Sequence, residues 1–158
     1  MDATTMPKTD LVKRLRADFP QFTLESGQDF YWSPDKQTVF FRPLKTASDA
    51  KVLLHEMSHA LLGHRNFTRD IDLLKMEREA WAYAKRELSG LYKVRIDDED
   101  IEDSLESYRG WLHDRSRCPN CTLTGIQIDG DQYRCLGCSL EWGVNDARRK
   151  RLKRTTIS

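Results

Sequence analysis

Residues 51–62 read KVLLHEMSHALL, a mostly apolar run that is followed by Gly63. The run predicts a helix that ends at Gly63, since glycine readily adopts the left-handed conformation found after a helix end. His55 and His59 are four residues apart, so on a helix they lie one turn apart on the same face. Two histidines placed in this way can bind one zinc ion.

Glu56 directly follows the first of these histidines, and residues 55–59 therefore match the pattern HExxH. In zinc peptidases with this pattern, the glutamate stays off the metal and acts as general base toward the attacking water. The alternative is that both histidines are ordinary residues of a helix surface. Three of the four histidines in the chain fall within residues 55–64, which favours a metal site.

A catalytic zinc ion generally has three protein ligands, so the motif requires a third. The metzincin pattern HExxHxxGxxH would place glycine at position 62 and histidine at position 65, where the chain has Leu62 and Arg65. That subclass is therefore excluded. His64 follows the predicted end of the helix, and we expect it to make a polar contact there.

A better third ligand lies on the next predicted helix, which covers about residues 68–88. Its apolar positions follow helical spacing along one side: Leu73, Leu74, Ala80, Trp81, Ala84 and Leu88. Glu77 is the only charged residue on this side, and a metal ion would offset the cost of burying its carboxylate. Glu79 is the alternative ligand, although its position predicts an exposed side chain. The sequence thus predicts a catalytic zinc site made of His55, His59 and Glu77.

The segments HEMSHALLGH (residues 55–64) and MEREAWAYA (residues 76–84) resemble the ImmA/IrrE family of gluzincin-type metallopeptidases. The resemblance covers about residues 51–88. It implies that Glu77 is the third ligand and that the substrate is a regulatory protein such as a repressor. It also implies a strand edge beside the active-site helix, where residues 39–42 would bind the substrate backbone by strand addition.

The chain departs from the gluzincin pattern at one position. Gluzincins often carry Asp or Asn four residues after the ligand glutamate, where it can orient a zinc-bound histidine, but this chain has Trp81 there. The residue that would stabilise the transition state is also left open. The candidates are Tyr83, Tyr108, Arg109 and His113.

Four cysteines form two CxxC pairs separated by thirteen residues: Cys118 with Cys121, and Cys135 with Cys138. Two such pairs are typical of a zinc ribbon, in which four thiolates hold one structural zinc ion. We expect this module to need its metal in order to fold, because it is too small to bury a sufficient core. A redox dithiol is the alternative. We expect three side chains of this module to be exposed and available for partner binding: Gln127, Gln132 and Tyr133.

Local patterns predict the remaining elements. They indicate a helix over residues 8–18, a β-hairpin from residues 30–32 and 38–41, and a helix over about residues 98–115. Ser48 or Asp49 is the predicted cap of the active-site helix. The expected fold is α+β, with a small β-hairpin or sheet packed on a helical zincin core and a small β zinc ribbon after it. The expected domains are 1–115 (metallopeptidase), 116–147 (ribbon) and 148–158 (a basic, disordered tail).

Charge is distributed unevenly along the chain. Six of the 26 basic residues lie in the last eleven positions, where there is no acid, which leaves 20 bases against 25 acids elsewhere. The basic tail and the ribbon make nucleic acid a candidate partner besides the protein substrate, and a solubilising tail is the alternative. No segment approaches the roughly 20 apolar residues of a membrane span, and the N-terminus lacks the features of a secretory signal, which predicts a cytoplasmic protein without membrane contact.

Two other functions are compatible with the sequence. A SprT-like protease acting on DNA-attached proteins also combines HExxH with a terminal zinc ribbon, but it would use a third histidine, for which only His113 follows His64. A non-catalytic module that binds nucleic acid or protein would keep the metal sites for structure alone. The oligomeric state is not predicted.

Overall fold

The computed structural model describes residues 8–67, 69–145 and 153–157, and its chain divides into two compact units. The first unit comprises residues up to 66 together with 76–102, and the second comprises 67–75 together with the residues from 103 onward. Helices occur with one three-stranded and one four-stranded sheet. The predicted α+β class is therefore confirmed.

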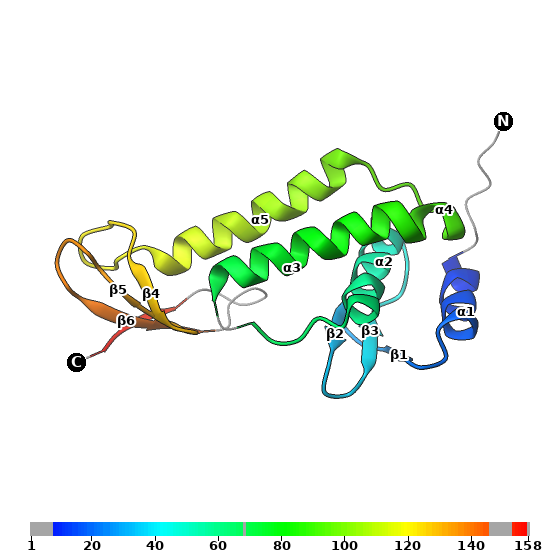
Figure 1. Cartoon of the computed structure of the whole chain (residues 1–158), viewed down its shortest axis with the longest axis horizontal. Coiled ribbons are helices and arrows are strands. Elements are labelled where there is room, and N and C mark those ends of the chain that lie inside the picture. Colours follow the sequence, from blue (N-terminus) through cyan, green and yellow to red (C-terminus); the bar gives the residue numbers. More distant parts are fainter. Residues whose placement is uncertain (1–7, 68, 146–152, 158) are drawn as a thin grey trace. The chain divides into compact units, whose positions relative to one another are not determined.

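The first unit contains a small sheet and the helix of the HExxH motif. Its elements up to this helix are α1 (Lys8–Asp18), β1 (Thr23–Ser26), β2 (Tyr31–Ser33), β3 (Thr38–Phe41) and α2 (Ala47–Leu62) (Figure 1). β2 and β3 form the predicted antiparallel hairpin, with Trp32 opposite Val39. β1, which was not predicted, pairs in parallel with the other side of β3. The strand order is thus β1-β3-β2, and β2 is an edge strand of this sheet.

Helix α2 begins with a capping box, slightly before the predicted cap. Thr46 is the N-cap residue, and its hydroxyl accepts a hydrogen bond from the backbone N–H of Asp49 at 3.2 Å. The Asp49 carboxylate accepts the N–H of Thr46 at 2.9 Å in return. Asp49 therefore caps the helix from its third position rather than from the N-cap itself. The helix ends at Gly63 in the left-handed conformation (φ 69°), as predicted.

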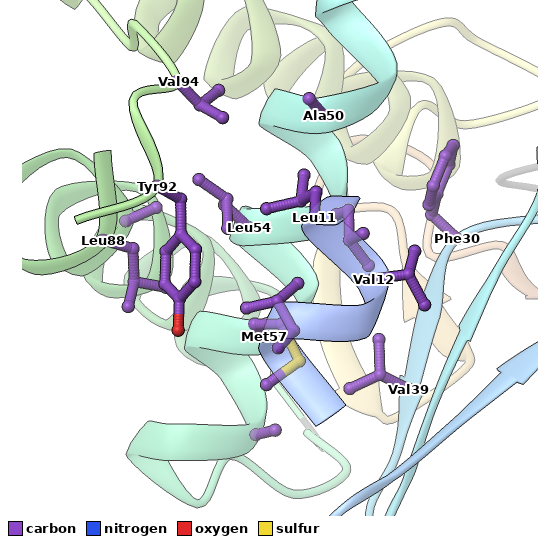
Figure 2. Packing of buried hydrophobic residues seen from close by; sticks show 14 of the residues in the cluster. Leu11, Val12, Phe30, Val39, Ala50, Leu54, Met57, Leu88, Tyr92 and Val94 are labelled. Atoms are coloured by element: carbon purple, nitrogen blue, oxygen red, sulfur yellow. The ribbon is translucent and has the colours of Figure 1, made fainter. Parts of the chain in front are cut away.

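The core of the first unit joins α1, the sheet and α2. Leu15, Val39, Leu53, Leu54 and Met57 are all fully buried in it. Figure 2 shows side chains of this cluster from α1, β3 and α2, among them Leu11, Val39 and Leu54. The inner face of α2 is therefore held by apolar packing.

The helix predicted over residues 68–88 extends further than expected. It consists of α3 (Asp70–Tyr83), the π-helical segment η1 (Ala84–Leu88) and α4 (Ser89–Tyr92), so it passes the predicted end at Ser89-Gly90. Tyr92 is buried, and its hydroxyl donates to Asp18 Oδ2 at 2.6 Å. This contact links the end of the helical segment to α1. Helix α5 (Asp98–Ser116) follows close to its predicted bounds.

The second unit contains an antiparallel sheet in the order β4-β5-β6-β7. Its strands are β4 (Ile126–Asp129), β5 (Gln132–Arg134), β6 (Glu141–Val144) and β7 (Arg154–Thr156). β7 lies within the segment 148–158 that was expected to be a separate tail, and it pairs with β6. The basic residues 148–151 lie outside the described part of the chain.

The buried side chains of the second unit form two clusters. One gathers Leu73, Tyr108 and Leu112 from parts of α3 and α5, and the other consists of Cys118, Tyr133, Cys135, Trp142 and Val144. Within the described residues, no helix is both long and apolar enough to cross a membrane.

Candidate metal centres

Three side chains of the first unit point their ligand atoms at one another. The Nε2 atoms of His55 and His59 on α2 are 3.1 Å apart. Glu77 on α3 places Oε2 2.8 Å from His55 Nε2 and Oε1 3.1 Å from His59 Nε2. The structure thus brings together the three residues predicted as ligands, and this group can hold a metal ion.

The geometry of this group suits a small cation such as zinc. Donors bound tetrahedrally at 2.0–2.1 Å are separated by about 3.3 Å, close to the observed 2.8–3.1 Å. The exposed fractions of His55, His59 and Glu77 are only 3%, 7% and 3%. Glu77 Oε2 is buried with His55 Nε2 2.8 Å away, and among the described residues it has no hydrogen bond of good geometry. A metal ion would satisfy this oxygen.

The two histidines also determine the charge of Glu77. Burial by itself would raise the pKa of this carboxyl, but the charge and hydrogen bonding of His55 and His59 outweigh it and lower the pKa well below 4.5. The carboxylate form, which is the form that binds metal, is therefore favoured.

Glu79, the alternative ligand, faces a different partner. Its side chain is 47% exposed against 4% for that of Glu77. Its Oε2 lies 3.1 Å from His64 Nε2. Of the two glutamates, only Glu77 lies in the group that can bind metal.

His64 lies at the end of α2, as predicted, and its ring contacts a candidate ligand. Its Nδ1 is 2.9 Å from His59 Nδ1, and its backbone N–H donates to the carbonyl of His59 at 3.0 Å. Burial lowers the pKa of His64, and the neighbouring His59 lowers it further. The position of His64 after the helix could be predicted, but its ring contact with His59 could not, because that contact depends on the turn at Gly63.

Trp81 occupies the position where gluzincins often carry an acid or amide. Its ring stacks on that of His55, with centroids 4.2 Å apart and an angle of 20° between the planes. His55 Nδ1 is buried and has no hydrogen-bond partner within the described chain. The indole therefore fixes the orientation of His55 by packing, where an acidic residue would do so by hydrogen bonding.

Glu56 is tied to the edge strand of the sheet. The backbone N–H of Trp32 in β2 donates to Glu56 Oε2 at 3.1 Å, and the Trp32 indole N–H donates to the carbonyl of His64 at 2.8 Å. Sequence reasoning missed Trp32, since nothing in the hairpin pattern indicates a contact with α2.

The strand expected to bind substrate is not available for that purpose. Val39–Phe41 belong to β3, which pairs with β1 on one side and β2 on the other. A central strand has no unpaired edge to offer, so the expectation for residues 39–42 is wrong. The edge strand in contact with α2 is β2.

The four cysteines form the second candidate metal centre. Their sulfurs approach in two pairs, Cys118 with Cys138 at 3.7 Å and Cys121 with Cys135 at 3.2 Å. All four are free thiols, and together they can hold one metal ion. Sulfurs bound tetrahedrally at 2.3 Å are about 3.8 Å apart, so the spacing is near that of a four-thiolate site.

Backbone N–H groups point at the first sulfur of each CxxC pair. Cys118 Sγ accepts the N–H of Cys121 at 3.5 Å. Cys135 Sγ accepts those of Cys138 and Gly137 at 3.4 and 3.3 Å. The N–H of Cys138, followed by the contact with Cys121, lowers the pKa of Cys135 to about 6. These bonds favour the thiolate, which is the form that binds metal.

Two of the three side chains expected to be exposed on this module are engaged with the start of α3. Tyr133 is 1% exposed, and its hydroxyl donates to Asp70 Oδ2. Gln127 is half-buried, and its Oε1 accepts the N–H of Asp70 at 2.9 Å. These two residues therefore stabilise the second unit, and the expectation of exposure is wrong for Tyr133.

Comparison of the chain with family models, curated proteins and solved structures finds no match. The assignment of function therefore depends on the two candidate metal centres themselves. Of the candidates for transition-state stabilisation, Tyr83 belongs to the first unit, and Tyr108, Arg109 and His113 belong to the second.

Proposed function

We propose that this chain is a zinc-dependent endopeptidase in which His55, His59 and Glu77 hold the catalytic zinc ion and Glu56 is the general base. One observation carries the proposal: ligand atoms of three buried side chains converge within 3.1 Å. In addition, Glu56, which follows His55, accepts a hydrogen bond from the edge strand of the sheet. If His55 and His59 were ordinary surface residues, nothing would offset the free-energy cost of burying the Glu77 carboxylate beside them.

A bound zinc ion would polarise the carbonyl of a peptide bond and make an attacking water more acidic. Glu56 accepts a proton from that water while the water oxygen attacks the carbonyl carbon. The proton then passes to the leaving nitrogen as the C–N bond breaks. Since Trp32 N–H occupies Glu56 Oε2, Oε1 is the oxygen that takes the proton in this scheme.

The substrate backbone would bind along β2. An extended peptide can add to a sheet edge by main-chain hydrogen bonds, and β2 is the edge strand that contacts α2. The Trp32 N–H on this strand already donates to Glu56, so the peptide would bind through the other backbone groups of the edge. The peptide would then run past Glu56. Following the family resemblance, we propose a regulatory protein such as a repressor as the substrate.

The cysteine group would hold a structural zinc ion, which makes the module a zinc ribbon. Two of the five side chains in its buried cluster are the cysteines themselves. With so small an apolar core, the metal would supply much of the folding free energy. Binding of nucleic acid by this module and by the basic segment that follows is a secondary proposal.

Capture of the substrate tests the peptidase proposal. The zinc-loaded Glu56→Gln variant should keep its metal, lose cleavage, and retain proteins that the wild type cuts. Glu25→Gln, which alters an exposed glutamate on β1, is the matched control and should cleave normally. If Glu56→Gln retains no protein that the wild type cleaves, the chain is a binding module instead.

Metal analysis distinguishes the proposed peptidase from a module that binds metal only at the four cysteines. The wild type should contain about two zinc ions per chain, and a His55→Ala, His59→Ala variant should contain about one, because four-thiolate and His-His-Glu sites each bind one ion. An unchanged count would refute the catalytic site. The position of Glu77 also favours the ImmA/IrrE-like assignment over a SprT-like one, which would require a third histidine.

A further inference from the structure

Three side chains form a hydrogen-bonded series that ends at one of the candidate zinc ligands. Glu79 Oε2 is 3.1 Å from His64 Nε2, and His64 Nδ1 is 2.9 Å from His59 Nδ1. His59 Nε2, on the far side of that ring, faces His55 and Glu77 at 3.1 Å each. The series therefore runs from a half-exposed carboxylate into the buried group.

Hydrogen bonding in this series allows one arrangement of protons when His64 is neutral. A carboxylate has only acceptor atoms, so the hydrogen between Glu79 and His64 must be on His64 Nε2. A neutral imidazole carries one hydrogen, so His64 Nδ1 must accept, and the hydrogen of that contact is on His59 Nδ1. His59 Nε2 is then left with a lone pair directed at the other two ligand atoms.

We propose that His64 and Glu79 are positioning residues that fix the ligand tautomer of His59. The inference rests on the proposed zinc site and adds to it two residues that do not touch the metal. A carboxylate behind a metal-binding histidine is a known way to orient the ring and raise its basicity. Here His64 lies between the metal-binding histidine and the carboxylate, which is that of the half-exposed Glu79.

The two histidine ligands are consequently held by different means. Trp81 stacks on His55, whose Nδ1 has no hydrogen-bond partner in the described part of the chain. His59 instead has a hydrogen-bonded support. Removal of His64 should therefore weaken the site through His59 without disturbing the stacking of His55 on Trp81.

The affinity of the full-length chain for its second zinc ion tests the proposal. The cysteine site is filled first, and the second ion is titrated against a chelator. His64→Phe, which keeps a ring but no hydrogen bond, should weaken binding about 10–100-fold. His64→Asn should restore most of the affinity, because its Oδ1 can accept where His64 Nδ1 does. Lys13→Phe, which places a ring at an exposed position of α1, is the control and should bind as the wild type.

Glu79 gives a second pair of variants. Glu79→Leu should weaken the second site, whereas Glu79→Gln should change it little, since an amide oxygen can still accept the His64 hydrogen. Equal affinity of the wild type, His64→Phe and Glu79→Leu would overturn the proposal. A failure of the zinc site itself would look different, because the wild type would then bind no second ion and His59→Ala would have no effect.

Nitrogen NMR of the zinc-loaded wild type needs no variant. Ring correlations should show His64 with its hydrogen on Nε2 alone and His59 with its hydrogen on Nδ1. A hydrogen on His64 Nδ1 would reverse the series and overturn the proposal. Zinc on His59 Nε2 by itself leaves the hydrogen of that ring on Nδ1, so the tautomer of His64 is the signal that decides the test.

Discussion

Helices α2 and α3 carry the histidine–glutamate group, whereas two CxxC turns beside a small sheet carry the four cysteines. The helical group lies in a unit with a large apolar core, and neighbouring side chains orient its histidines. In the cysteine group, Cys118 and Cys135 are themselves part of the buried cluster. The apolar core of the first unit positions the histidine–glutamate group. In the cysteine group, the ligands themselves make up a large part of the buried core.

This difference implies that metal has a different effect on each unit. Without metal, a proton on Nε2 of His55 or His59 can pair with the Glu77 carboxylate in place of the ion, and the core of α1, α2 and the sheet remains. Four thiols without metal have only weak hydrogen bonds with one another. The first unit should therefore keep its fold without metal, and the cysteine module should not.

Removal of both metal ions has the largest expected effect. With excess chelator, the cysteine module should unfold, because a structural zinc site contributes about 10 kcal/mol or more to the folding of a small module. The indole N–H of Trp142, which donates to the carbonyl of Arg115 at 2.9 Å, reports on this module. Its NMR signal should move to the position of a solvated indole.

Trp32 provides the matched reporter in the first unit. Its indole N–H donates to the carbonyl of His64, and its signal should stay dispersed in chelator. If the two signals are lost together, the first unit also depends on metal. If neither changes, the cysteine module is stable by itself.

Local sequence patterns sufficed for the elements that carry the ligands. The apolar spacing around Glu77 predicted its burial, and the spacing of His55 and His59 predicted their common face. These features depend on residues a few positions apart. Both ligand groups could therefore be predicted before the structure was known.

Features that depend on distant residues could not be predicted. The parallel pairing of β1 with β3 involves a segment without alternating apolar residues, Thr23–Ser26. The contact of Trp32 with Glu56 spans 24 positions, and that of Tyr133 with Asp70 spans 63. Tyr133 was expected to be exposed because a tyrosine in a short strand gives no sign of the helix it will contact.

Replacing Glu77 or Glu79 by glutamine tests which of the two glutamates is the third ligand of the histidine–glutamate site. Glu77→Gln should weaken the second zinc site by more than the 10–100-fold typical of losing an outer partner, because it removes a direct charged ligand. Glu79→Gln should change the affinity by less than about threefold, since its amide keeps the bond to His64. Zinc titration of chains with a filled cysteine site measures both.

The fold of the Glu77→Gln variant should be retained, because the first unit does not depend on its metal in this interpretation. Its thermal unfolding should stay close to that of Glu79→Gln when both are metal-free. The reverse order of zinc affinities, with Glu79→Gln the weaker, would move the third ligand to Glu79.

The smallest expected effect concerns the start of α2, where helix capping acts independently of metal. Burial would raise the pKa of Asp49, but hydrogen bonds from Lys45, Thr46 and Arg42 outweigh it and lower the pKa from 3.8 to about 2. The charged carboxylate is thus favoured in the folded state and stabilises it above about pH 4. As pH falls from about 4 to about 2, the carboxylate is protonated and this contribution is lost.

Asp49→Asn should therefore lower the free energy of unfolding by about 0.3–1 kcal/mol near neutral pH, which is the usual contribution of a negative charge in the first turn of a helix. The difference from the wild type should shrink as the pH falls through the same range, because the wild type then loses its charge as well. Denaturant unfolding of metal-free protein, followed at the Trp32 indole, measures this difference within the first unit. Asp35→Asn, in the exposed β2–β3 turn, is the control. A difference that persists unchanged at pH 2 would mean that Asp49 acts through its shape and not through its charge.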